Sequence, residues 1–357
     1  MPLSHRENYL RNATFSGPEW IPCSISCSGA TWNQLRNDLE DVLVKHPILF
    51  PGFQKGKHKY DSFNGQHKTG EFVDNWGCVW ENMIDGIVGE VKKHPLASWE
   101  ALRTFKAPDP TRFTPLGTIN WDKTLADIKR AKERGGLTTG SVEHGFFLMR
   151  LWYLRGFENL MMDIASNEPR LRDLIRIVEE YNRFFVEGYV GAGIDVMHFG
   201  EDLGAQTASI ISPKQFDGWV APSYRRLMQP CRKAGTQVFL HSDGHTLELI
   251  GQLIDCGVTI INPQDLVNGI ENLEREVKGR VCIQLDIDRQ SIVPFGTRAE
   301  IRELIEEEVK RLGSPRGGLA LTCGFYPPTP PENIDAVLCA VEEFRTYWWD
   351  GRAKLSA

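Results

Sequence analysis

Four short apolar runs in the final third of the chain, each closed by polar residues, constrain its fold more than any other feature. They span residues 237–243, 258–265, 281–288 and 318–323. The intervals of roughly 20–40 residues leave room for a crossover helix between neighbouring strands, which is the rhythm of a parallel β-α-β sheet. The sequence therefore predicts an α/β fold.

The length and composition of the chain are typical of a soluble globular protein. The chain has 357 residues, 41% hydrophobic and 25% charged, a size that an α/β barrel with insertions commonly reaches. A net charge of −6 without a Lys/Arg cluster argues against binding to nucleic acid or an anionic membrane. No apolar stretch is long enough to span a bilayer, and residues 1–7 lack the core of a signal peptide. We expect a cytoplasmic protein whose eight scattered cysteines are reduced.

Two of the predicted strands end in residues that bind metals. The run 237–243 ends in His241, Ser242 and Asp243, and the run 318–323 ends in Cys323. Because parallel strands deliver their last side chains to one edge of the sheet, these residues are expected to lie close together. Histidine, carboxylate and thiolate are zinc ligands, and three protein ligands with an open position are typical of catalytic zinc. A structural histidine and a buried cysteine are the simpler readings of each residue taken alone.

The rest of the chain is less regular. We expect strands at 20–27 and 194–204, a hairpin-like stretch at 61–85, and helices at 32–46 (after Thr31 as cap), 122–134, 146–165 and 169–190. Cys23 and Cys27 are four residues apart on a predicted strand, which puts both on one face and favours core packing over metal binding.

Acidic and basic residues follow two further strands. Glu143 and His144 precede Gly145, where they either cap the helix that follows or face the pocket. Glu201 and Asp202 end the strand at 194–204. Adjacent residues on extended backbone point to opposite sides, so only one of these two acids is expected to face a common pocket directly.

Several segments resemble the uroporphyrinogen decarboxylase superfamily, and two of them, 73–80 and 154–158, match its corrinoid-methyltransferase-like branch. The others are 199–206, 211–216, 221–222, 240–244, 261–264 and 323–327. The resemblance covers roughly residues 70–345. It implies a (β/α)8 TIM barrel as a single domain over 1–357, with residues 1–70 as an N-terminal extension and the active site at the carboxyl ends of the strands.

The resemblance also implies chemistry. The zinc methyltransferases of the superfamily bind metal through His-x-Cys and a distant Cys, which points to His241, Asp243 and Cys323 here, with Asp243 where the nearer Cys is expected. A carboxylate makes the site harder and favours an oxygen-bearing ligand, and hence O-demethylation. Asp243 as an outer residue with Glu201 as third ligand stays open. The N-terminal arginine motif with which the true decarboxylase holds its tetrapyrrole is missing.

Roles for other residues follow from the same resemblance. Glu201, His144 and Asp202 are the candidate catalytic groups. The candidate substrate contacts are Asp74, Trp76, Glu143, Gln264 and Tyr326. The chain has no region resembling a corrinoid-binding domain, so the cofactors expected are zinc and a corrinoid carried by a partner protein.

Three functions from different classes are compatible with this sequence. The first is a zinc-dependent methyltransferase that moves a methyl group between a small methoxylated or N-methylated compound and a corrinoid protein. The second is a metal-free lyase that decarboxylates a small aromatic or heterocyclic acid, with His241, Asp243 and Glu201 as acid–base groups. The third is a non-catalytic binding protein that kept the barrel.

Overall fold

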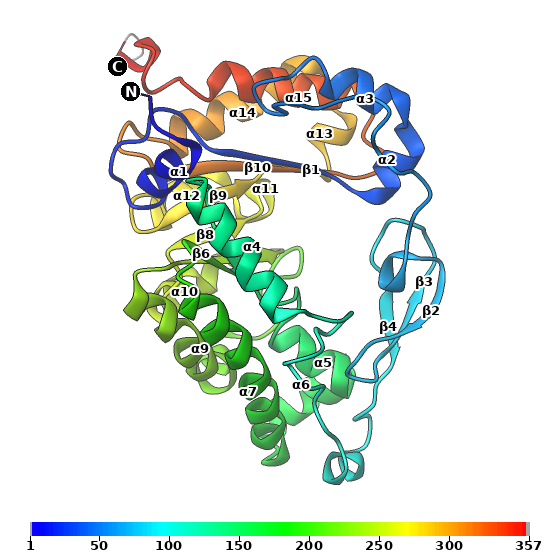
Figure 1. Cartoon of the computed structure of the whole chain (residues 1–357). Coiled ribbons are helices and arrows are strands. Elements are labelled where there is room, and N and C mark those ends of the chain that lie inside the picture. The colour runs from blue at the N-terminus through cyan, green and yellow to red at the C-terminus, as the bar shows by residue number, and fades with distance from the viewer. Residues whose placement is uncertain (1, 355–357) are drawn as a thin grey trace. The chain divides into compact units, whose positions relative to one another are not determined.

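The computed structural model describes residues 2–354 and divides the chain into two compact units (Figure 1). Unit 1 contains the residues up to Lys68, the segment Ile84–Val88 and the residues from Asn262 onward. Unit 2 contains Thr69–Met83 and Gly89–Ile261. Within residues 2–354, no helix is both long and apolar enough to cross a membrane.

Unit 2 is built on three parallel strands, β5 (Thr139–Ser141), β6 (Val196–Asp202) and β7 (Gln237–Asp243), with β6 between the other two. A separate antiparallel sheet consists of β2 (Gly70–Val73), β3 (Val79–Asn82) and β4 (Glu90–Lys93), in agreement with the hairpin expected at 61–85. The helices are η2 (Trp99–Arg103), α4 (Trp121–Glu133), α5 (Leu148–Arg155), α6 (Phe157–Ser166), α7 (Arg170–Gly191), α8 (Pro213–Gln215), the π-helix η3 (Phe216–Val220), α9 (Ala221–Ala234), η4 (Leu247–Leu249) and α10 (Ile250–Cys256).

Unit 1 contains the parallel strands β1 (Cys23–Cys27), β10 (Leu319–Phe325) and β9 (Cys282–Asp286), and β8 (Ile260–Pro263) spans the chain's passage from unit 2 into unit 1. Every residue of β9 is buried, as expected for a parallel strand covered on both faces. The helices are α1 (His5–Ala13), α2 (Gly29–Leu35), α3 (Asn37–Leu43), η1 (Gly65–His67), α11 (Asp265–Asn268), α12 (Ile270–Glu276), α13 (Ile292–Phe295), α14 (Arg298–Leu312), α15 (Pro331–Phe344) and η5 (Arg352–Lys354).

The predicted fold class is confirmed. Seven parallel strands alternate with helices in the part of the chain described, which gives an α/β fold of TIM-barrel-like type. The eighth strand of the expected barrel is not among them. All four apolar runs of the final third overlap a strand, and 237–243 coincides with β7.

Two predicted helices are each divided into two. The helix expected at 32–46 consists of α2 and α3, which meet at Arg36 with φ of 47°, and its cap is Ser28 instead of Thr31. The helix expected at 146–165 consists of α5 and α6, separated by Gly156 with φ of 85°. A glycine adopts this left-handed backbone without steric cost, so the break at Gly156 could have been placed from the sequence.

A buried acidic group lies in the core of unit 1. Glu308 on α14 is fully buried beside Asp265 and Asp288. Burial raises the pKa of Glu308 well above its ordinary range, and the negative charges of Asp265 and Asp288 raise it further. The carboxylate of Asp288 accepts backbone hydrogen bonds at the start of α13 and so stabilises the beginning of that helix. Burial also raises the pKa of Asp265, but its carboxylate accepts backbone hydrogen bonds from Leu266 and Asp288. Glu308 is therefore the member of this group that carries a proton.

We predict that Glu308→Gln raises the free energy of unfolding, and that it does so more at pH 8 than at pH 5. The folded-state pKa lies above the unfolded value of about 4.3, so the contribution of protonated Glu308 is complete below that value and is lost as pH rises through the folded pKa. The amide resembles the protonated acid and does not titrate. Urea denaturation of both proteins across this pH range measures the difference, and a difference independent of pH would contradict the assignment.

Candidate functional site

Two histidines and two aspartates meet at the carboxyl ends of the unit 2 strands. His144 Nε2 lies 3.2 Å from Asp202 Oδ1, and His241 Nε2 lies 4.0 Å from the same oxygen and 3.4 Å from Asp243 Oδ1. The imidazole rings of His144 and His241 have centroids 5.6 Å apart. All four side chains are partly exposed to solvent. These four predicted residues thus form one polar cluster that a small molecule can reach.

Strand register and glycine create the space for this cluster. In the parallel pairing of β6 with β7, Gly200 lies opposite His241 and Asp202 opposite Asp243. A Cβ atom on Gly200 would lie 3.0 Å from Cδ2 of His144, so the glycine leaves room for that imidazole. Beyond the strands, the backbones of Gly204 and Gly244 approach each other so closely that neither position has room for a side chain.

The charges of the cluster support one another. Burial lowers the pKa of His144, but the hydrogen bond with Asp202 and the charges of Asp202, Glu201 and Asp243 outweigh it and raise the pKa. Burial likewise raises the pKa of Asp202, and the hydrogen bond with His144 and the nearby His241 lower it overall. The cluster therefore combines an ionised carboxylate with an imidazole that readily holds a proton, in a setting that attracts cations.

The same atoms fit a metal ion. One ligand atom from each of His144, Asp202 and His241 lies within 4.8 Å of the other two. Two imidazoles and a carboxylate match the three-ligand sets of catalytic zinc, which leave a fourth position for substrate. The cluster thus has the donor chemistry for zinc, or alternatively for acid–base catalysis without a metal.

Glu201 has a different position from its neighbour Asp202. Its carboxylate is fully buried and accepts hydrogen bonds from the backbone N–H groups of Phe147, Leu148 and Met149, at 2.8–3.1 Å. The hydroxyl of Tyr224 donates a fourth bond at 2.7 Å. The prediction that only one of the two adjacent acids faces the pocket agrees with these contacts. Both carboxylate oxygens are engaged at the start of α5, which favours a structural role for Glu201.

The alternative reading of Glu143 and His144 as a helix cap was wrong. The first N–H groups of α5 bind Glu201, which comes from a strand more than 50 residues later, and the residue before α5 provides no side-chain cap. Glu143 instead lines a cavity of about 130 Å³ with Tyr181 and Tyr189, and burial is the main cause that raises its pKa.

The predicted substrate contacts Asp74 and Trp76 are buried inside unit 2. Asp74 forms an ion pair with the buried Arg150 at 2.9 Å and accepts hydrogen bonds from the backbone of Trp76 and from the indole of Trp80. Trp76 packs on Tyr181 and lies near the Arg150 guanidinium. These contacts favour a structural role for the segment 73–80, and substrate contact by either residue stays a prediction.

The remaining predicted residues belong to unit 1. Cys323 on β10 is fully buried, and burial together with Asp286 raises its thiol pKa well above the ordinary range. Gln264 is buried, with a backbone bridge to Asp286. Tyr326 is 40% exposed and lines a cavity of about 300 Å³ together with Ser28 and His67, as a substrate contact requires. Zinc binding by Cys323 with His241 and Asp243 stays a prediction.

Sequence reasoning missed several charged residues near these positions. Arg289 forms an ion pair with Asp286 at 2.8 Å and lies over the ring of Tyr326, where it is a candidate anchor for an anionic substrate. Asp286 ends β9, and the rule that singled out Asp243 at the end of β7 would have found it. Arg150 and Tyr224 lie within helices, where the sequence gives no sign of their buried partners.

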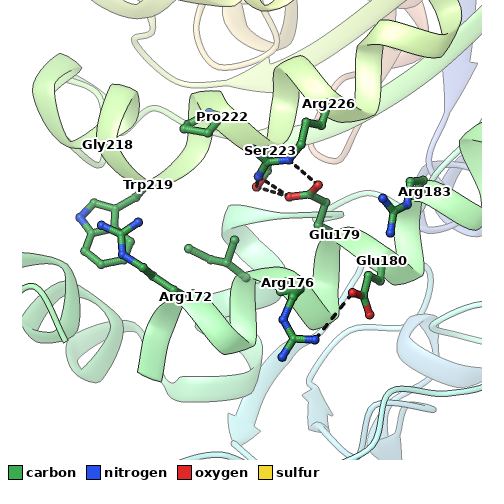
Figure 2. Close-up of a pocket in the computed structure, with 11 residues that line it drawn as sticks. Arg172, Arg176, Glu179, Glu180, Arg183, Gly218, Trp219, Pro222, Ser223 and Arg226 are labelled. Atoms are coloured by element: carbon green, nitrogen blue, oxygen red, sulfur yellow. Dashed lines mark hydrogen bonds and ion pairs between the residues drawn. The ribbon is translucent and has the colours of Figure 1, made fainter. Parts of the chain in front are cut away.

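A larger cavity, of about 400 Å³, lies between α7 and α9 of unit 2 and contains none of the predicted residues (Figure 2). Its Glu179 accepts hydrogen bonds from Arg226 and Ser223, and Arg176 pairs with Glu180, as Figure 2 shows. These ion pairs satisfy most of its charges, so cavity size alone does not identify the active site here.

The sequence pattern of the uroporphyrinogen decarboxylase (URO-D) family matches residues 82–344. The chain belongs to the URO-D family. A curated relative in Solibacter usitatus (strain Ellin6076), a uroporphyrinogen decarboxylase, is 26% identical over 193 residues, which are 54% of this chain and 53% of the relative. The chain thus matches about half the length of that relative.

A methyltransferase from Methanosarcina mazei has a similar solved structure. The TM-score is 0.63 at 17% sequence identity, over 96% of this chain and 99% of the other. At this identity the structural similarity supports the fold of this chain and no more. The similarity extends over nearly the whole length of both chains.

We predict that Glu201→Gln lowers the free energy of unfolding by on the order of 3 kcal/mol, because its amide group turns an N–H donor toward the N–H groups of α5. Tyr224→Phe removes one donor and is expected to cost about 1 kcal/mol. Urea denaturation measures both, with Glu143→Gln as a control. A Glu201→Gln protein of unchanged stability that lost a bound metal would instead make Glu201 a ligand.

Proposed function

We propose that this URO-D family member is a zinc-dependent methyltransferase that moves a methyl group between a small methoxylated or N-methylated compound and a corrinoid protein. The observation that carries the proposal is the cluster of His144, Asp202 and His241 at the carboxyl ends of β5, β6 and β7. The resemblance of segments 73–80 and 154–158 to the corrinoid-methyltransferase-like branch supports the same reaction class.

In this proposal His144, Asp202 and His241 hold the zinc, with Asp243 beside His241 adding negative charge. Bound zinc would supply a Lewis acid for the oxygen or nitrogen that loses its methyl group. The partial exposure of His144 and Asp243 leaves one side of the cluster open to the substrate. A ligand set of His241, Asp243 and Cys323, as the sequence predicts, is the competing arrangement.

The other residues position this set. Glu201 holds the first turn of α5, which follows His144 by four residues, and so fixes the loop that carries the imidazole. The distance of 3.2 Å between Asp202 Oδ1 and His144 Nε2 already brings these two ligand groups together. Tyr326 and Arg289, which lie together in unit 1, are candidates to contact the substrate or the partner protein.

A decarboxylase is the second candidate. The raised pKa of His144 favours an imidazolium paired with Asp202, and such a group can protonate the carbon that loses carbon dioxide. The curated relative from Solibacter usitatus carries that activity in its name. In this case His241 and Asp243 would act as a second acid–base pair without metal.

The ligand set determines zinc content. We predict that His144→Ala, Asp202→Asn and His241→Ala each lose one equivalent of zinc per chain while the far-ultraviolet circular dichroism is unchanged, and that Cys323→Ser keeps it. Elemental analysis after reconstitution measures the metal. Asp217→Asn, an exposed carboxylate on η3, is the matched control.

Loss of zinc in Cys323→Ser and His241→Ala, with His144→Ala unaffected, would establish the competing ligand set. Full zinc content in all of these variants would overturn the zinc proposal and favour the lyase.

The reaction itself is visible with a corrinoid protein. We predict that cob(I)alamin on a carrier protein is converted to its methylated form with at least one of a panel of methoxy-aromatic and methylated-amine compounds, as followed by visible absorption. His241→Ala and Asp202→Asn are expected to slow this step by about 10²-fold or more, because removal of a ligand or proton-transfer group has effects of this size. Carbon dioxide release from a carboxylated aromatic, without any methylation of cobalt, would establish the decarboxylase instead.

A further inference from the structure

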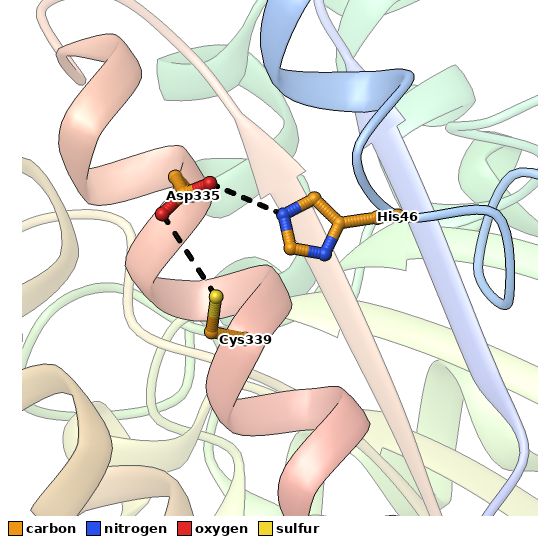
Figure 3. A group of neighbouring side chains, drawn as sticks. All are labelled: His46, Asp335 and Cys339. Carbon is orange, nitrogen blue, oxygen red and sulfur yellow. Dashed lines mark hydrogen bonds and ion pairs between the residues drawn. The ribbon is translucent and has the colours of Figure 1, made fainter.

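A second group of metal-ligand side chains lies in unit 1, outside the parallel strands. His46, Asp335 and Cys339 each offer one ligand atom within 4.8 Å of the other two (Figure 3). Asp335 and Cys339 are four residues apart on α15 and therefore share one face of that helix. His46 comes from the turn after α3, which packs against α15.

The two nitrogens of His46 both face carboxylates. Nδ1 lies 3.0 Å from Oε2 of Glu342, and Nε2 lies 3.3 Å from Oδ1 of Asp335. A neutral imidazole carries one N–H, so it can donate to only one of these oxygens. If the proton is on Nδ1 and is donated to Glu342, the lone pair of Nε2 faces Asp335, and a cation between the two satisfies both. A carboxylate behind the second nitrogen is the arrangement that orients metal-binding histidines.

A guanidinium group occupies the outer side of this cluster. Arg298, the first residue of α14, donates to Asp335 Oδ2 at 2.8 Å and to Cys339 Sγ at 3.0 Å. The cluster thus already binds a positive charge through two of the three groups that would bind a metal. The Arg298 side chain is 60% exposed, so it can turn into solvent when another cation takes its place.

We propose that His46, Asp335 and Cys339 form a second metal site, selective for a borderline divalent cation such as Zn²⁺, which displaces Arg298 and links the turn after α3 to α15. One nitrogen, one carboxylate oxygen and one thiolate are all zinc ligands, and their separations need to shrink only to roughly 3–4 Å for tetrahedral binding. The site is independent of the proposed methyl transfer.

Binding requires one proton to leave. Burial raises the pKa of the Cys339 thiol, and Asp335 raises it further, so the free site holds a thiol. On binding, the S–H bond breaks, sulfur keeps the electron pair as a thiolate ligand, and the proton goes to solvent. No oxidant or reductant takes part.

Cobalt(II) tests this site because a thiolate–cobalt bond gives a charge-transfer absorption that nitrogen and oxygen ligands do not give. The full-length Cys323→Ser protein serves as background, since it lacks the other thiolate predicted to bind a metal. We expect the charge-transfer band of the Cys323→Ser protein to saturate at one thiolate-bound cobalt ion per chain. The band is expected to be absent after the further change Cys339→Ser. His46→Gln is expected to weaken binding by about 100-fold and Glu342→Gln by about 10-fold.

Arg298→Ala distinguishes a metal site from a salt-bridge network. Removal of the competing guanidinium is expected to tighten cobalt binding several-fold, whereas loss of a stabilising ion pair in a purely structural network would leave cobalt unbound. Glu343→Gln is the matched control, because Glu343 lies on α15 with Asp335 and Cys339 and pairs with Arg302. Absence of the charge-transfer band in the Cys323→Ser protein, or its persistence after Cys339→Ser, would overturn the proposal.

Discussion

The geometry of the candidate site depends on the buried carboxylate of Glu201. This side chain reaches from the end of β6 to the first turn of α5 and accepts three backbone N–H bonds there. Hydrogen bonds to a charged acceptor contribute about 1.5–3 kcal/mol each, and a negative charge at a helix N-terminus is favourable in addition. Because His144 lies four residues before α5, the same contact that begins the helix fixes the loop on which the imidazole stands.

Glu201 makes the structural contacts with α5, and the adjacent Asp202 is therefore available to the polar cluster. Strand alternation sends one acid into unit 2 and the other toward His144 and His241. The resulting cluster attracts cations whether the cation is a proton on an imidazole or a metal ion. The two functions proposed for this chain differ in the cation that the cluster would hold, a proton for the decarboxylase and a metal ion for the methyltransferase.

The sequence was sufficient for most strands of the parallel sheet, for the fold class and for the family. Apolar runs that end in His, Asp or Cys indicated β7 and β10. A parallel strand that is buried on both faces is a nearly continuous apolar run, and polar residues follow where the strand leaves the sheet. The same reasoning brought His241, Asp243 and Asp202 to one edge, where the distances agree. The family resemblance, read from short segments, agrees with the match over residues 82–344.

The sequence did not allow us to predict which residue contacts each buried charge. The Asp74–Arg150 pair and the Glu201–Tyr224 contact join residues far apart along the chain, so no local pattern shows them. The resemblance of the segment 73–80 to the family suggested substrate contact by Asp74 and Trp76. Their burial and their contacts with Arg150 favour a structural role, and substrate contact stays a prediction. His46 and Cys339 likewise lie almost 300 residues apart and gave no signal before folding.

The central proposal is that His144, Asp202 and His241 bind one zinc ion. X-ray absorption at the zinc edge, on zinc-loaded Cys339→Ser protein, tests it most directly because it reports the ligand atoms themselves. The account predicts a first shell of nitrogen and oxygen only, at about 2.0–2.2 Å, with outer-shell scattering from two imidazoles. A zinc–sulfur distance of about 2.3 Å would make Cys323 a ligand and contradict this ligand set, and a protein that binds no zinc would contradict the account as a whole.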